Sequence, residues 1–174
     1  MSLELLLKGA FARFGYQVQQ TPLPIRDKDP RFNRIMDEIA GLTLLDPARC
    51  FMLYQFALQV RDLQGDAVEV GVYRGGTAKL LGRALEGAGK TLHLFDTFAG
   101  MPPTDRDKDL HKEKDFSDSS LELVQANLRG IEGVRFHAGV FPETAKGIGD
   151  LTLALAHIDV DIHKSIWDTF HRQF

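Results

Sequence analysis

The chain has 174 residues, of which 44% are apolar and 26% charged, and its net charge is -3. This composition is typical of one globular domain of ordinary size and gives no reason to expect attraction to nucleic acid or to an anionic membrane. No apolar run approaches the roughly 20 residues that span a bilayer, and the N-terminus lacks the pattern of a secretory signal. The single cysteine, Cys50, excludes an internal disulfide framework, favours a cytoplasmic location and is interpreted as a core thiol.

The first 64 residues are predicted to form an N-terminal arm followed by helices, a region that would act as a lid or a dimer contact. Residues 1–29 end in TPLPIRDKD, a charged stretch with prolines that is typical of a loosely attached arm. Apolar residues at helical spacing predict two helices within residues 31–62, separated near Leu45–Pro47. Asp46 before Pro47 is a good start signal for the second helix, because an N-cap residue precedes proline at the first helical position.

From residue 65 to residue 174, short apolar runs alternate with helical patterns. The predicted strands are AVEVGV, TLHLFD, VRFHAG and LTLALAHIDV. The predicted helices are GTAKLLGRALEGA, SSLELVQANL with Ser119 as its N-cap, and one that begins with HKSIWDTFHRQF; PETAKGI is a short helix or turn. Because helices alternate with near-continuous apolar strands, we expect an α/β, Rossmann-like parallel sheet covered on both faces.

The stretch from Val68 to Gly82, VEVGVYRGGTAKLLG, joins the first strand to the next helix. Ligands of parallel α/β sheets bind at the carboxyl ends of the strands, and a glycine there leaves room because it has no Cβ. The dinucleotide pattern G-x-G-x-x-G is not met, because Tyr73 and Arg74 occupy its middle. The pattern instead fits an adenosine ligand without a pyrophosphate, with Glu69 and Arg74 supplying opposite charges. The alternative is that the glycines only close a tight turn.

The second predicted strand ends in Asp96, about 25 residues after Gly71. A carboxylate at this place can accept hydrogen bonds from both hydroxyls of a ribose. The alternative interpretation is an N-cap or a loop carboxylate.

Several segments occur in an order and spacing that resemble those of one family of enzymes, the macrocin O-methyltransferase type. The segments are EVGVYRGGTAKLL, HLFDTFAGMPP, LHKEKDFSDSSLELVQANL, GVRFHAGVFPETA and LALAHIDVDIHKSIWDTF, within about residues 65–170. These class I enzymes use S-adenosylmethionine to methylate sugar hydroxyls of macrolide and aminocoumarin antibiotics. The resemblance implies an O-methyltransferase that acts on a small hydroxylated natural product, with S-adenosylmethionine and Mg²⁺ as cofactors.

The resemblance also implies roles for individual residues. Asp96 corresponds to the ribose-binding acid and Ser120 to a position near the adenine. The predicted cofactor-binding residues are Glu69, Gly71, Tyr73, Gly75, Gly76, Asp96 and Ser120.

The predicted catalytic and metal-binding residues lie in HIDVDIH and in the loop after the second strand. Asp159 and Asp161 are the predicted magnesium ligands, and His111 is the predicted general base. The metal would lower the pKa of the acceptor hydroxyl, so that the oxygen can attack the methyl group. His163 replaces the tyrosine usual in the family. Two alternatives remain, a separate metal site of Asp159, Asp161 and His163, and Asp161 as a helix N-cap.

Members of the family continue past the fourth strand with a fifth strand, whose acidic residues complete the metal site. We therefore expect the sheet order 3-2-1-4 with the C-terminal strands missing, in a chain that is a fragment or naturally short. The open apolar edge at Leu151–Ile158 predicts self-association into a homo-oligomer. A cofactor-binding remnant without activity and an NAD-binding oxidoreductase are the alternative functions.

Overall fold

The computed structural model describes residues 29–101, 116–141, 143–146 and 150–160. The expectations for the arm at residues 1–28, for His111, and for Asp161, His163 and the helix that follows fall outside these residues. The described elements in chain order are α2 (Pro30–Glu38), α3 (Pro47–Gln59), β1 (Asp66–Val70), α4 (Gly76–Leu85), β2 (Leu92–Asp96), α5 (Leu121–Asn127), β3 (Val134–Ala138), the 3-10 helix η2 (Glu143–Ala145) and β4 (Leu153–Ile158).

The four strands form one parallel sheet in the order β3-β2-β1-β4, which confirms the expected order. Val70, the last residue of β1, is in register with Phe95 of β2 and with Ile158 of β4. The backbone pairing continues just past the strands, since the Gly71 amide donates to the Phe95 carbonyl at 2.9 Å and the Asp159 amide donates to the Val70 carbonyl at 2.8 Å. The carboxyl ends of β1, β2 and β4 therefore meet at one edge of the sheet.

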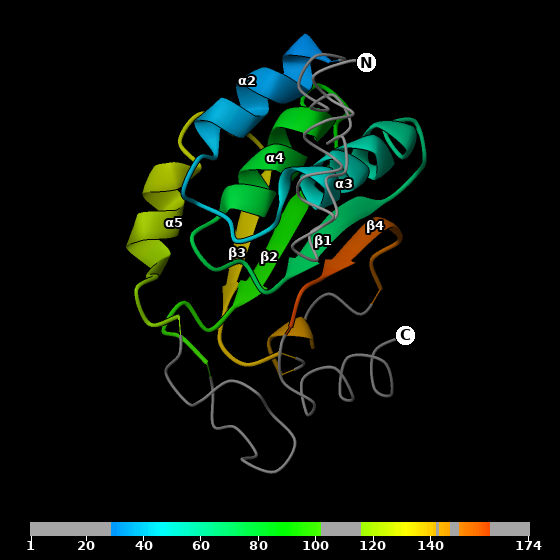
Figure 1. The fold of residues 1–174 in the computed structure, drawn as a ribbon. Helices are drawn as coiled ribbons and strands as arrows, with labels where there is room; N and C mark the ends of the chain where they lie inside the picture. The colour runs from blue at the N-terminus through cyan, green and yellow to red at the C-terminus, as the bar shows by residue number, and fades with distance from the viewer. Residues whose placement is uncertain (1–28, 102–115, 142, 147–149, 161–174) are drawn as a thin grey trace, which may run out of the picture.

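Helices α2, α3 and α4 lie on one face of the sheet (Figure 1). Their buried side chains, among them Phe32, Tyr54 and Leu80, share one core with Ala67 of β1 and Leu94 of β2. This core crosses the predicted boundary at residue 64, so the N-terminal helices pack as part of the same body as the sheet. The opposite face carries a smaller apolar cluster, which consists of Val68, Val70, Phe95 and Ala145 with Phe141, Leu153, Ile158 and Val160 around it.

Helices α3 and α5 begin just after a side chain that accepts hydrogen bonds from the backbone amides of the first turn. Asp46 caps α3 as predicted, with its Oδ1 accepting from the amides of Ala48 and Arg49 at 2.9 and 3.1 Å. The prediction for α5 is wrong by one residue, because its N-cap is Ser120, whose Oγ accepts from the Leu123 amide at 3.2 Å. Ser119 instead donates its hydroxyl to the Tyr73 carbonyl. None of the helices in the described ranges is long and apolar enough to cross a membrane.

Candidate functional site

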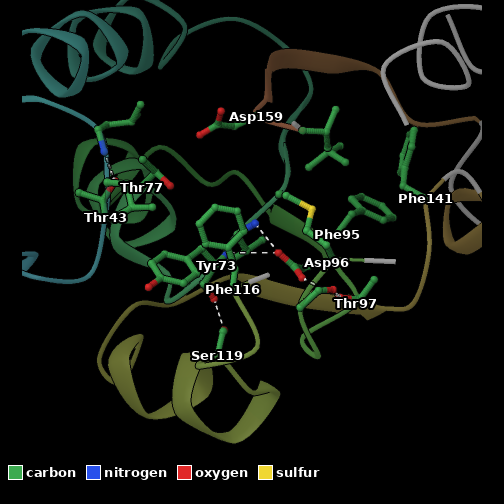
Figure 2. A pocket seen from close by; sticks show the side chains of 18 of the residues that line it. Thr43, Tyr73, Thr77, Phe95, Asp96, Thr97, Phe116, Ser119, Phe141 and Asp159 are labelled. Carbon is green, nitrogen blue, oxygen red and sulfur yellow. Dashed lines mark hydrogen bonds between the residues drawn. The ribbon is translucent and has the colours of Figure 1, made fainter. Parts of the chain in front are cut away.

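A cavity of about 380 Å³ opens at the carboxyl ends of the strands. Its walls come from the turns after β1, β2, β3 and β4, from residues next to α5, and from the segment between α2 and α3. Figure 2 shows the Tyr73 and Phe116 side chains of the lining above Ser119, with Thr43 and Thr77 to one side of them and Asp96 and Thr97 to the other. The pocket thus lies where ligands of parallel α/β sheets bind.

Asp96 fixes the turn that follows β1. Its Oδ2 accepts from the amides of Val72 and Tyr73 at 2.6 and 3.1 Å, and its Oδ1 accepts from the Phe98 amide at 2.8 Å. Tyr73 has a φ of 52°. This left-handed conformation is uncommon for a residue with a side chain, and it persists only where the surrounding contacts hold it. Asp96 therefore lines the pocket and also stabilises the conformation of the turn after β1.

The wall on the α5 side comes from Tyr73 and its partners. The Tyr73 hydroxyl donates to Asp118 Oδ2 at 3.1 Å, and its ring packs edge-on against Phe116 with centroids 5.5 Å apart. Arg74 also pairs with Asp118, and its guanidinium lies 5.3 Å from the centroid of the Tyr73 ring. The prediction that Arg74 supplies the positive charge of the pocket is therefore not met, because Arg74 is turned to Asp118 and does not line the cavity.

The glycines of the turn give room to other parts of the chain. A Cβ on Gly71, where φ is +89°, would lie 2.0 Å from the Asp159 carbonyl oxygen, and one on Gly76 would lie 2.6 Å from the carbonyl carbon of Leu42. A Cβ on Gly75 would lie 3.0 Å from a methyl group of Val124. Gly71 lines the pocket, but the close approach that excludes a side chain there is that of β4. Gly75 and Gly76 serve packing behind the wall.

Glu69 lies behind the pocket and is completely buried. Its Oε1 lies 3.1 Å from His157 Nδ1, and its Oε2 has no hydrogen-bond partner among the described residues. Burial raises the pKa of Glu69. Burial alone would lower the pKa of His157, but the hydrogen bond to Glu69 and the charges of Glu69 and Asp159 outweigh it and raise that pKa. The protonation of each side chain is thus coupled to that of the other.

Asp159 follows β4 and lines the pocket. Within the ranges that the structure describes, no group of three or more histidine, cysteine, aspartate or glutamate side chains could hold a metal ion. Asp161 and His111, the other predicted catalytic and metal-binding residues, lie outside these ranges. The described residues alone therefore do not form a magnesium site.

The predicted site residues divide into two groups. Gly71, Tyr73, Asp96 and Asp159 line the pocket, whereas Glu69, Gly75, Gly76 and Ser120 do not. Sequence reasoning missed Thr43, Arg49, Thr77, Phe116 and Ser119, which also line it. Thr77 and Ser119 are neighbours of predicted residues and could have been found by extending the motif. Thr43 and Arg49 precede β1, and no pattern near them pointed to the ligand.

Comparisons with known proteins show the family of the chain. The family model described as Macrocin-O-methyltransferase (TylF) matches residues 38–174. A demethyldecarbamoylnovobiocin O-methyltransferase of Streptomyces niveus is 34% identical over 122 residues, which are 62% of this chain and 47% of the relative. The 8-demethyl-8-(2,3-dimethoxy-alpha-L-rhamnosyl)-tetracenomycin-C 4'-O-methyltransferase of Streptomyces olivaceus is 34% identical over 118 residues, which are 60% of this chain and 45% of that relative. The chain thus spans about half the length of the curated relatives that it matches.

Solved structures share the fold. The crystal structure of CalS11, a calicheamicin methyltransferase, superposes with a TM-score of 0.59 at 16% identity, over 94% of this chain and 75% of that one. The structure of cofactor-bound Rv0187 from MTB gives a TM-score of 0.51 at 17% identity, over 82% of this chain and 63% of that one.

Proposed function

Because the chain belongs to the macrocin-O-methyltransferase (TylF) family, we propose that its pocket binds S-adenosylmethionine and that the protein is an O-methyltransferase. The observation that carries this proposal is the pocket itself, which lies over the Gly71 turn beside the carboxylate of Asp96. S-adenosylmethionine supplies an activated methyl group when bound. Its volume and its mixture of an apolar ring, a sugar and charged groups suit a cavity of about 380 Å³ with both polar and aromatic walls.

Each wall has a separate task in this proposal. Asp96 offers its Oδ1 atom to a ribose hydroxyl, because Oδ2 already accepts two backbone amides whereas Oδ1 accepts one, from Phe98, with the Thr97 hydroxyl 3.4 Å away. Tyr73 and Phe116 supply an aromatic surface for the adenine ring. Asp159 places a negative charge at the end of β4, near the side where a cationic sulfonium centre would lie. The chain thereby orients the methyl group toward an acceptor, and such positioning supplies a large part of the rate enhancement.

The acceptor in this proposal is a hydroxyl group of a small natural product, and specifically of a glycoside used in antibiotic biosynthesis. The support is the two relatives, whose names describe O-methylation of a novobiocin precursor and of a rhamnosyl tetracenomycin. Each relative is matched over about half of its length, so the acceptor is proposed at the level of a chemical class.

Dependence on Mg²⁺, held by Asp159 and Asp161, remains a separate proposal. Its support is the family resemblance and the position of Asp159 on the pocket wall. The described residues do not by themselves fit the ion. Methyl transfer that is lost in a chelator and restored by added Mg²⁺ would support the proposal, and transfer unaffected by the chelator would contradict it.

Binding and transfer test the proposal in turn. Calorimetric titration should show binding of S-adenosylhomocysteine and none of NADH, because the turn lacks the glycine that lets a pyrophosphate approach. Binding of NADH alone would favour the oxidoreductase instead. Incubation with labelled S-adenosylmethionine and candidate glycosides then measures transfer. Binding without transfer to any glycoside would favour a cofactor-binding protein that is not an enzyme.

We also propose that the protein self-associates through β4. Among the strands that the structure describes, β4 lies at an edge of the sheet, and it pairs with β1 on its other side. Leu151, just before β4, is exposed. Unpaired strand edges with apolar side chains favour association with another chain. Light scattering should therefore give the mass of a dimer or a larger oligomer, and a monomer at micromolar concentration would contradict the proposal.

A further inference from the structure

The described lining of the pocket contains three charged side chains, Arg49, Asp96 and Asp159. Asp96 already accepts the backbone amides of the turn after β1. Arg49 is the only cationic side chain among the described residues that line the cavity. A ligand with a carboxylate would thus find one side chain of opposite charge in this part of the structure.

Arg49 lies in the first turn of α3, just after the segment Leu42–Leu45 that also lines the pocket. This segment is attached to α4, because the Gly76 amide donates to the Leu42 carbonyl at 3.2 Å. Thr43 from the segment and Thr77 from α4 lie together on one side of the pocket, and Asp96 and Thr97 lie on the other (Figure 2). The pocket therefore has two chemically different ends.

The first turn of α4, which carries Thr77, adds positive character to the side of the pocket where Thr43 and Thr77 lie. Gly75 caps this helix without any side-chain hydrogen bond, and none of the first-turn residues, all of which the structure describes, is acidic. The positive end of the helix dipole therefore has no carboxylate of its own to compensate it.

Arg49 is free to turn toward a ligand. Its Nε lies 3.5 Å from Asp46 Oδ2, and the two side chains are 74% and 55% exposed. An exposed ion pair of this kind contributes little, so a ligand carboxylate can replace Asp46 as the partner. A guanidinium group binds a carboxylate through two parallel hydrogen bonds, which gives strength as well as orientation.

We propose that Arg49 binds the carboxylate at the amino-acid end of the cofactor, with that end lying between α3 and the first turn of α4. This inference rests on the proposed binding of S-adenosylmethionine and assigns a residue that precedes β1 to the cofactor site. It replaces Arg74 as the source of positive charge. The adenosine end then lies beside Asp96, on the opposite side of the pocket.

The test uses ligands that differ only at the amino-acid end. Calorimetry compares S-adenosylhomocysteine, its decarboxylated form and 5'-methylthioadenosine, which lacks the amino-acid end altogether. Arg49→Gln should weaken S-adenosylhomocysteine binding roughly tenfold to a hundredfold, the range for a charge-assisted hydrogen bond. It should leave the binding of the other two ligands within about twofold of the wild type. The decarboxylated form should bind the wild type about as weakly as S-adenosylhomocysteine binds the variant.

The control is Arg129→Gln, which makes the same charge change at an exposed residue just after α5, outside the pocket. It should leave all three affinities unchanged, and far-ultraviolet circular dichroism should show the same fold for both variants. If the wild type binds all three ligands and Arg49→Gln weakens all equally or none, the inference is wrong while the cofactor site stands. If the wild type binds none of them, the proposed function and the inference both fail.

Discussion

The Oδ2 atom of Asp96 accepts a hydrogen bond from the backbone amide of Val72 at 2.6 Å. Val72 follows β1 and Asp96 ends β2. The carboxylate of Asp96 therefore connects the turn after β1 to the end of β2. The same oxygen also accepts the Tyr73 amide, and Tyr73 lines the pocket. A residue predicted only as a ligand contact is therefore also the support of the loop that shapes the site.

Asp96→Asn should weaken the binding of S-adenosylhomocysteine and of 5'-methylthioadenosine alike, by about tenfold or more. In asparagine, an NH2 group replaces one of the two carboxylate oxygens. This NH2 group would face a backbone N–H group that now donates to Asp96, and only one acceptor atom would remain. The same change should lower the free energy of unfolding by about 1–3 kcal/mol, because backbone amides lose their partner. Calorimetry and urea denaturation measure the two effects. Asp150→Asn, at an exposed residue, is the control, and unchanged affinities in Asp96→Asn would remove Asp96 from the site.

Gly71→Ala should lower the free energy of unfolding by about 3 kcal/mol or more. The added Cβ would meet the Asp159 carbonyl oxygen at 2.0 Å, and φ is +89°, so overpacking adds to the cost of a left-handed backbone. Gly87→Ala is the matched control, because Gly87 has a φ of +76° and a Cβ added there would have no other atom within 4 Å. It should cost only about 1 kcal/mol. Equal losses in urea denaturation would show that the contact with β4 is unimportant.

His157→Gln should destabilise the protein more at about pH 6 than at about pH 9. The pKa of His157 is raised above its ordinary value of 6.5 by Glu69 and Asp159, despite its burial. Its protonated form therefore stabilises the fold fully below the unfolded pKa, and this contribution is lost as the pH rises through the folded pKa. The difference in melting temperature between wild type and variant should shrink across this range. A difference that stays constant or grows with pH would contradict the prediction.

Cys50 should react slowly with thiol reagents in the native protein and rapidly in denaturant. The side chain is completely buried, and burial together with the nearby charge of Asp46 raises the pKa of the thiol to about 11. Because the thiolate is the nucleophile, both the low accessibility and the high pKa slow the reaction. A colorimetric disulfide reagent at about pH 8 measures the rates. Rapid native labelling would show that the thiol is accessible.

The sheet could be predicted from the sequence because each strand is a short, largely apolar run between turn residues, although β1 contains Glu69 and β3 contains Arg135 and His137. A strand buried on both faces needs such a run, and LHLFD of β2 is an example in which four of the five residues are buried. Caps were predictable to within one residue. At α5 two serines stand side by side, and only the packing decides that Ser120 caps the helix while Ser119 faces Tyr73.

The pocket could be predicted only where strand ends define it. Gly71 and Asp96 follow from the rule that parallel strands bind ligands at their carboxyl ends. Thr43 and Arg49 could not be found in this way, because a contact between residues far apart in the chain depends on how α2 and α3 pack against α4. Arg74 was assigned wrongly for a similar reason, since its partner Asp118 lies 44 positions further along the chain.

The hydrogen bond from the Gly76 amide to the Leu42 carbonyl has a practical consequence. A trimmed version that starts at the first strand would lose Leu42–Leu45 and Arg49 from the edge of the cavity, and it would expose the core that α2 and α3 share with α4 and the sheet. Versions prepared for crystallisation or for ligand screening should therefore begin before Pro30. A substitution in the segment Leu42–Leu45 should therefore weaken ligand binding even though this segment lies outside the sheet.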